Sequence, residues 1–140
     1  MKIKKIISFL LFFALCICIS ACGGDTSQDD LWKDASYTND AAFGNGAKII
    51  ELEVKAGNKS VTFTINTDAD NLEDALTEHN IIDGDEGPYG IYIKKVNGIT
   101  ADYDVDQSYW SLSKNGEPLM SGASGVQLNG GEHFEFVYTK

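Results

Sequence analysis

The stretch IELEVKAGNKSVTFTI, residues 50–65, decides the fold because apolar and polar side chains alternate along both of its halves. The apolar positions are Ile50, Leu52 and Val54 in the first half and Val61, Phe63 and Ile65 in the second. A period of two places one face of a strand in a core and the other in water. Residues 55–59, between the halves, include Gly and Asn, which favour a turn. The stretch therefore predicts a β-hairpin with one buried face.

The sequence after this hairpin predicts one short helix and several further strands. Leu72, Ala75, Leu76 and His79 fall at helical spacing, with Asp70 or Asn71 as the cap. Residues 83–88 break the chain, and extended patterns follow at 89–96, 109–113, 117–120 and 133–139, with Asn-Gly turn pairs at 97–98 and 115–116. One helix on a mostly antiparallel sheet is an α+β fold. Among such folds we expect a β-grasp-like arrangement.

The amino-terminal part of the sequence predicts export and lipid attachment. Residues 1–21 carry three lysines and then an apolar run too short to span a bilayer comfortably, as in a cleaved signal peptide. The run Ile19-Ser20-Ala21-Cys22 resembles the lipobox of bacterial lipoproteins, which implies acyl chains on Cys22. We expect this anchor to hold the protein on the extracytoplasmic face of the cell membrane. The alternative is an ordinary signal peptide that contains a cysteine.

Two segments follow the signal. Residues 22–46 are rich in Asp, Ser, Thr, Asn and Gly and lack an apolar period, which predicts a flexible acidic tether. Trp32 is interpreted as a loosely packed residue of this tether or, alternatively, as a contact for a partner. Residues 47–140 are long enough for one small domain with a modest core.

The charge balance excludes one class of partner. Removal of three lysines with the signal leaves 8 basic against 21 acidic residues, a net charge of about −13 with no arginine. So acidic a chain argues against a nucleic-acid partner and against electrostatic binding to anionic lipid, so the acyl anchor must hold the protein at the membrane. Cys16 and Cys18 leave with the signal, and the mature chain then has neither a disulfide nor a cysteine nucleophile.

The residues provide little for catalysis or metal binding, and we expect a protein that is not an enzyme and has no cofactor or transition-metal site. His79 is interpreted as a structural residue at a helix end, and His133 opens the final strand. Asp102, Asp104 and Asp106 alternate like the first ligands of an EF-hand loop, but the turn glycine and the closing glutamate of that motif are absent. A solvated acidic loop is the favoured interpretation, with calcium binding as the alternative.

Aromatic residues indicate a binding module. Tyr89, Tyr92, Tyr103, Tyr109 and Trp110 gather around two predicted strands and the loop that joins them. So small a domain cannot bury all of them, and exposed rings provide a rigid apolar contact surface. We therefore expect a surface for a flat or bulky ligand, or for a protein partner.

Several short runs of the sequence share one resemblance, at residues 75–82, 84, 90–93, 96–98, 109–110, 115–117 and 121–122. Together they resemble the transcobalamin-like C-terminal domain of bacterial lipoproteins, and the run 109–139 also resembles the β-domain of the animal cobalamin carriers. The resemblance implies capture of cobalamin or a related ligand and its transfer to an uptake transporter. It also implies ligand contacts at Tyr92, Trp110, Leu112, Leu119 and Met120, although Trp110 is equally well interpreted as core. This chain lacks the helical barrel that completes the pocket of the animal carriers, so it would provide half of a clamp.

A second hypothesis needs no small ligand. The domain would then be a cell-envelope interaction module that presents an aromatic face or an edge strand to a partner protein. Residues 133–139 are the candidate edge strand. A concave aromatic cleft would favour the ligand hypothesis, and a flat aromatic patch would favour the partner hypothesis.

Overall fold

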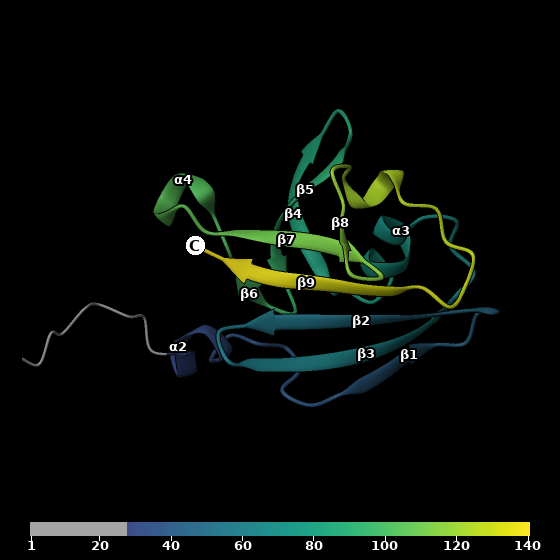
Figure 1. Cartoon of the computed structure of the whole chain (residues 1–140), viewed down its shortest axis with the longest axis horizontal. Helices are drawn as coiled ribbons and strands as arrows, with labels where there is room; N and C mark the ends of the chain where they lie inside the picture. The colour runs from purple at the N-terminus through teal and green to yellow at the C-terminus, as the bar shows by residue number, and fades with distance from the viewer. Residues whose placement is uncertain (1–27) are drawn as a thin grey trace, which may run out of the picture.

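The computed structural model describes residues 28–140, which form two β-sheets and a few short helices (Figure 1). The strands are β1 (Ala41–Gly44), β2 (Lys48–Ala56), β3 (Lys59–Thr67), β4 (Ile82–Gly87), β5 (Gly90–Val96), β6 (Ile99–Thr100), β7 (Tyr109–Lys114), β8 (Glu117–Pro118) and β9 (His133–Thr139). The helices are α2 (Gln28–Trp32), α3 (Leu72–Thr77), α4 (Tyr103–Asp106) and the 3-10 turn η1 (Ala123–Gly125). Within these residues no helix has the length and apolar character to span a membrane.

The larger sheet has six strands in the order β1-β3-β2-β9-β7-β8. Its β2–β3 hairpin confirms the one predicted from residues 50–65, with Ile50 paired to Ile65 and Val54 to Val61. β9 lies in the middle of the sheet, parallel to β2 and antiparallel to β7. The prediction that residues 133–139 could form an edge strand was therefore wrong, because both sides of β9 are hydrogen-bonded to neighbours.

The smaller sheet has three antiparallel strands in the order β4-β5-β6 and lies across the larger one in Figure 1. The sequence predicted a chain break at residues 83–88, but most of that run belongs to β4. The local sequence disfavours a strand here, and pairing with β5 stabilises it. A β-bulge lies between Asp83 and Gly84. A β-carbon at Gly84 would lie 1.9 Å from the carbonyl oxygen of Tyr92, so the close approach of the two strands requires glycine.

The helical and turn signals were read correctly in three places. Asn71 caps α3, where its side-chain oxygen accepts a hydrogen bond from the Asp74 backbone N–H at 2.9 Å. Both Asn-Gly pairs, at 97–98 and 115–116, have left-handed backbone angles and turn the chain between paired strands. The β-rich character of the fold is thus confirmed, with two sheets and several short helices where one sheet and one helix were expected.

The core is built by the inward faces of β2, β3 and β9 together with α3. The largest fully buried side chains are Phe63, Phe134, Phe136, Ile50, Leu52, Ile65, Leu72, Leu76, Ile81, Ile99, Val54 and Val96. Alternation along β2, β3 and β9 delivers the members of this set that lie on those strands to one face of the larger sheet, as the sequence predicted for the hairpin.

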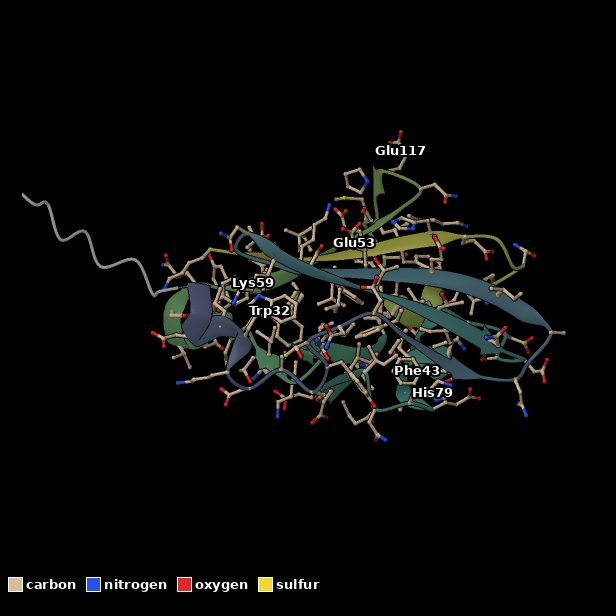
Figure 2. The ribbon with its side chains drawn as sticks, turned by 90° about the horizontal axis from the view of Figure 1, so that it is seen from below. Trp32, Phe43, Glu53, Lys59, His79 and Glu117 are labelled. Atoms are coloured by element: carbon tan, nitrogen blue, oxygen red, sulfur yellow. The ribbon has the colours of Figure 1, made fainter. Side chains whose placement is uncertain are left out.

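The described part of the predicted tether is folded onto this core. Trp32 is 7% exposed and donates its indole N–H to the carbonyl of Ala56 at 2.8 Å, and Figure 2 shows it directed into the interior. Phe43 on β1 packs edge-on against Phe63 at 5.4 Å between ring centroids. The prediction of a flexible tether was therefore wrong for this part of residues 22–46. Residues 1–27, which include the predicted signal peptide and Cys22, lie outside the described residues.

One buried side chain fastens the segment before β1. Asn97, which is 1% exposed, accepts a hydrogen bond from the Tyr37 backbone N–H at 3.0 Å and donates one to the Tyr37 carbonyl at 2.8 Å. The backbone carbonyl of Asn97 accepts a third hydrogen bond, from the Ser36 backbone N–H at 2.8 Å. These bonds join the amino-terminal segment to the β5–β6 turn of the smaller sheet, so that segment and the domain form one unit.

Candidate functional site

A cleft of about 530 Å³ lies where the smaller sheet meets β7 of the larger one. β5 and β7 form its walls, and residues between β8 and η1 also line it. Figure 1 shows where these elements lie in the fold. The lining residues are Ile91, Tyr92, Ile93, Tyr103, Tyr109, Trp110, Ser111, Leu112, Pro118, Leu119, Ser121, Gly122, Ala123 and Phe136. The volume and the mainly apolar lining are typical of small-molecule sites in proteins.

The structure brings four of the five predicted contact residues to this cleft. Tyr92 comes from β5, Trp110 and Leu112 from β7, and Leu119 from the segment after β8. Met120 is 98% exposed and does not line the cleft, although its neighbours on both sides do. Strand alternation explains the grouping of Trp110 with Leu112, whereas the position of Leu119 depends on its backbone hydrogen bond to Leu112 at 2.9 Å.

Trp110 is both a core residue and part of the cleft wall. Its side chain is 8% exposed and donates the indole N–H to the carbonyl of Ile99 at 3.3 Å. The ring also packs edge-on against Phe136 and Tyr138, at 6.4 and 5.7 Å between centroids. The core interpretation of Trp110 is therefore confirmed, and the same side chain also lines the cleft. Ligand contact at Trp110 stays a prediction.

Tyrosine side chains form the rim. Tyr92 is 55% exposed, Tyr103 54% and Tyr109 44%, although all three line the cleft. Half-exposed rings of this kind leave apolar surface uncovered, together with hydroxyl groups that can donate or accept hydrogen bonds. Tyr89 is 88% exposed at the tip of the β4–β5 hairpin and does not line the cleft.

Sequence reasoning missed Ile91 and Ile93 on β5 and the part of the cleft lining that lies between β8 and η1. Ile91 and Ile93 lie on either side of Tyr92 on β5, and all three residues line the cleft. Three apolar or aromatic residues in a row could have predicted a strand that makes contacts on both of its faces. The contribution of Ser121, Gly122 and Ala123 had no such signal, because it depends on how the chain between β8 and β9 folds back over the smaller sheet. Gly and Ser in that run predicted only a loop.

The tip of the β4–β5 hairpin is held in place by α3 and η1. The Glu73 carboxylate accepts a hydrogen bond from the Ile91 backbone N–H at 3.0 Å, and the Ser124 hydroxyl donates to the Tyr89 carbonyl at 2.7 Å. Gly90 lies between these bonds with φ of +100°. A β-carbon there would be 2.5 Å from both Glu73 Oε2 and Ser124 Oγ, so glycine is needed for the two elements to close on the tip. These two hydrogen bonds fix the position of the first residues of β5, next to Tyr92.

Lys94 is the cation beside the tyrosine rim. Its ammonium lies 5.9 Å from the centroid of the Tyr92 ring, 2.8 Å from a carboxylate oxygen of Asp85 and 3.5 Å from one of Asp102. The hydrogen bond to Asp85 raises the pKa of Lys94 above its ordinary value, against the opposing effect of burial, and the charge of Asp102 adds to the increase. The positive charge is therefore already matched by two carboxylates.

The predicted acidic loop at residues 102–106 contains the short helix α4. Asp102 caps it by accepting a hydrogen bond from the Asp104 backbone N–H at 3.1 Å, and Asp106 accepts one from the Ser108 backbone N–H at 3.1 Å. The Ser108 hydroxyl also donates to Asp106, and these bonds lower the pKa of the Asp106 carboxyl. Within residues 28–140, no group of three or more His, Cys, Asp or Glu side chains is arranged to hold a metal ion.

The two histidines lie away from the cleft. His133 Nδ1 is 3.3 Å from Glu51 and its Nε2 is 3.7 Å from Glu53, on the polar face of the larger sheet. The His79 ring stacks on Phe43 at 5.4 Å between centroids, as Figure 2 shows, and its buried Nε2 has no hydrogen-bond partner among the described residues. Stacking on β1 agrees with a structural role for His79, although the sequence did not foresee its partner.

A second, smaller hollow of about 420 Å³ is lined by Ala47, Ile49, Glu51, Gly130, Gly131 and Glu132. The Glu132 side chain is 6% exposed and accepts backbone hydrogen bonds from Asn129 at 2.6 Å and Gly130 at 2.8 Å. Burial acts to raise the pKa of Glu132, but these backbone donors outweigh it and hold the pKa below its ordinary value. Its carboxylate is engaged with its own loop, which indicates a structural role.

The comparisons with solved structures agree with this architecture. A protein from Ruminococcus gnavus ATCC 29149, described as a candidate metal-binding protein, superposes with a TM-score of 0.62 at 33% sequence identity, over 66% of this chain and 97% of that one. Haptocorrin in complex with Cbi superposes with a TM-score of 0.54 at 24% identity, over 70% of this chain and 26% of that one. The second likeness is one of fold.

The sequence comparisons identify the family. Human transcobalamin-1 is 30% identical over 83 residues, which are 59% of this chain and 18% of that protein. The chain thus spans less than a fifth of the curated relative that it matches. Residues 69–140, about half of the chain, match the family described as a domain of unknown function, DUF4430. The chain therefore belongs to the DUF4430 family, and its domain is transcobalamin-like, as the sequence resemblance predicted.

Proposed function

We propose that this protein is a lipid-anchored binding protein that captures cobalamin or a related corrinoid outside the membrane for uptake. The observation that carries the proposal is the cleft between β5 and β7, with its apolar floor and its half-exposed tyrosine rim. A flat ligand placed there would cover the rings of Tyr92, Tyr103 and Tyr109 and reach the Trp110 surface. The likeness to transcobalamin-1 supports the corrinoid class.

The cleft would provide half of a clamp. Three rim tyrosines remain about half exposed, and a ligand larger than the cleft would keep its other face in water. We propose that a partner protein or an uptake transporter covers that second face and receives the ligand. The protein would act as a carrier without chemical conversion, because the cleft lining holds no pair of groups suited to general acid–base catalysis.

Calorimetric titration of cobalamin and of cobinamide into soluble protein tests this function. Residues 23–140 should be used, because a protein that started at residue 46 or 47 would lose Trp32 and β1 from the fold. We expect saturable binding at micromolar concentration or tighter. Absence of heat at high ligand concentration with folded protein would contradict direct capture by this chain alone.

A matched pair of tyrosine variants locates the site. Tyr92→Ala removes a rim ring and should weaken binding about tenfold, since stacking on an aromatic side chain contributes about 1 kcal/mol or more. Tyr89→Ala removes the same side chain from the same hairpin, but outside the cleft, and should leave the affinity unchanged. Equal losses in the two variants would place the ligand elsewhere.

The anchor needs its own test. We propose that Cys22 carries the acyl chains and that the protein lies on the extracytoplasmic face of the cell membrane. Metabolic labelling of the full chain with an alkyne fatty acid should mark the wild type and leave Cys22→Ser unlabelled and released from membranes. Labelling of the Cys22→Ser chain would refute the assignment.

One observation favours a second function, an envelope module for a partner protein. Tyr89, Val105 and Met120 are 88%, 80% and 98% exposed, which leaves apolar side chains free for contact. This function would gain weight if corrinoids did not bind and Tyr89→Ala or Met120→Ala abolished cross-linking to a defined transporter.

The β-grasp-like arrangement also remains our proposal, which the packing of α3 on the core supports.

A further inference from the structure

The side chains at the rim of the cleft are polar, and the side chains that line the cleft carry no charge. Among the described residues that line it, none is Asp, Glu, Lys, Arg or His. Its polar side chains are hydroxyls, from three tyrosines and from Ser111 and Ser121. Hydroxyls can donate or accept a hydrogen bond, so they suit uncharged partners such as carboxamides.

The Lys94 ammonium beside Tyr92 is not free to bind an anionic ligand at the rim. Lys94, the cation next to Tyr92, is already paired with Asp85 and Asp102. A carboxylate or phosphate that approached Lys94 would have to displace one of these partners. The mature chain also carries a net charge of about −13, which gives an anion an unfavourable field before contact.

We infer that the cleft selects its ligand by charge, taking a flat molecule with an apolar face and uncharged hydrogen-bonding groups at its edge, and excluding the same molecule when its edge carries carboxylates. This inference rests on the proposed function of the cleft. The physical reason is desolvation, because a carboxylate that loses water against Tyr and Leu side chains gains no cation in return. A carboxamide loses less and finds hydroxyl partners.

A matched ligand pair tests the inference. One ligand is a corrinoid with all side-chain amides intact, and the other is its monocarboxylic acid, in which one amide has been hydrolysed. Titration at neutral pH should show the acid binding about tenfold more weakly than the amide. In 1 M salt the Debye length falls to about 3 Å, so the difference that remains reports the cleft and not the distant surface charge.

The outcomes separate the inference from the proposed function. Binding of the amide with equal binding of the acid would overturn charge selection and leave corrinoid capture standing. Loss of the difference in high salt would also overturn it, because the whole-protein field would then explain the preference. Binding of neither ligand would overturn both.

A charge placed in the cleft provides a gain-of-binding test. Ser121 lies on an exposed loop and lines the cleft, so Ser121→Lys should fold and should strengthen acid binding relative to amide binding about tenfold. Ser60→Lys makes the same change in net charge on β3, which β2 and β9 separate from β7, and should leave the acid-to-amide ratio unchanged. An equal effect of the two lysines would contradict selection by the cleft.

Discussion

The central strands β3 and β9 of the larger sheet and the β4–β5 hairpin of the smaller sheet use aromatic side chains differently. On the larger sheet, Phe63, Phe134 and Phe136 are at most 1% exposed and lie in the shared core. On the smaller sheet, Tyr92 is 55% exposed, and Tyr89, at the β4–β5 tip, is 88% exposed. Phe63, Phe134, Phe136 and Tyr92 all lie on strands, so strand assignment alone does not separate rings that stabilise from rings that are available for contact.

The difference indicates which part of this fold contributes to stability and which part is available for binding. The larger sheet is stabilised by β2 and β9, because the inward side chains of both strands pack in the core. The β4–β5 tip depends on a few polar contacts from Glu73 and Ser124. Substitutions in the first region should therefore change the free energy of unfolding, and substitutions in the second should mainly change affinity.

The largest expected effect is at the centre of the larger sheet. Phe134→Ala removes a fully buried ring from β9 and should lower the free energy of unfolding by about 3 to 5 kcal/mol. Urea unfolding followed by circular dichroism measures the loss. A loss below about 1 kcal/mol would show that the larger sheet is not the stabilising region.

A somewhat smaller loss is expected where the amino-terminal segment joins this region. Trp32→Ala removes a ring that is 7% exposed and its bond to Ala56, and should cost about 3 kcal/mol. Lys33→Ala, at the next and exposed position, is the control and should change stability by less than about 0.5 kcal/mol. Equal stability of Trp32→Ala and wild type would restore the interpretation of a loose tether.

The Glu132 loop should contribute a pH-dependent part of the stability. Because the folded state lowers the pKa of Glu132, its contribution is complete above the ordinary carboxyl pKa of about 4.3 and is lost as the pH falls through the lower folded value. At pH 7, Glu132→Gln should cost about 1 to 3 kcal/mol, because hydrogen bonds to a charged acceptor are replaced. The gap between variant and wild type should close in acid, and a gap that is constant with pH would refute the assignment.

The smallest effect on stability is expected at the cleft rim. Tyr92→Ala should change the free energy of unfolding by less than about 1 kcal/mol, since its ring is more than half exposed. Thermal unfolding of this variant beside Tyr89→Ala measures the effect. A loss as large as that of Phe134→Ala would remove the distinction between the two sheets.

Local sequence patterns predicted the elements that depend on local chemistry. The β2–β3 hairpin, the Asn71 cap and the turns at 97–98 and 115–116 all follow from residues within a few positions of each other. β1 was missed because its support is a parallel pairing with β3, 22 residues away, which leaves no periodic signal in the run AAFG. β4 was missed because its glycines and acidic residues disfavour a strand until β5 pairs with it.

Several residues of the candidate site were predicted, but the shape of the cleft was not. The resemblance to the transcobalamin-like domain implied contacts at Tyr92, Trp110, Leu112 and Leu119, and the structure gathers these four residues at one cleft. The core position of Trp110 depends on contacts with Ile99, Phe136 and Tyr138, of which the last two are distant in the sequence. Such contacts are set by tertiary packing, which no local period encodes.

The folded amino-terminal segment has a consequence for the proposed anchor. Because α2 begins at Gln28, only five residues separate it from Cys22, and a trans backbone of that length reaches at most about 20 Å. With Cys22 acylated as proposed, the domain would be confined to a thin layer above the lipid. A membrane transporter in the same layer would then meet the cleft at an effective concentration far above that of a freely diffusing carrier, so even a weak contact between the two could support ligand transfer.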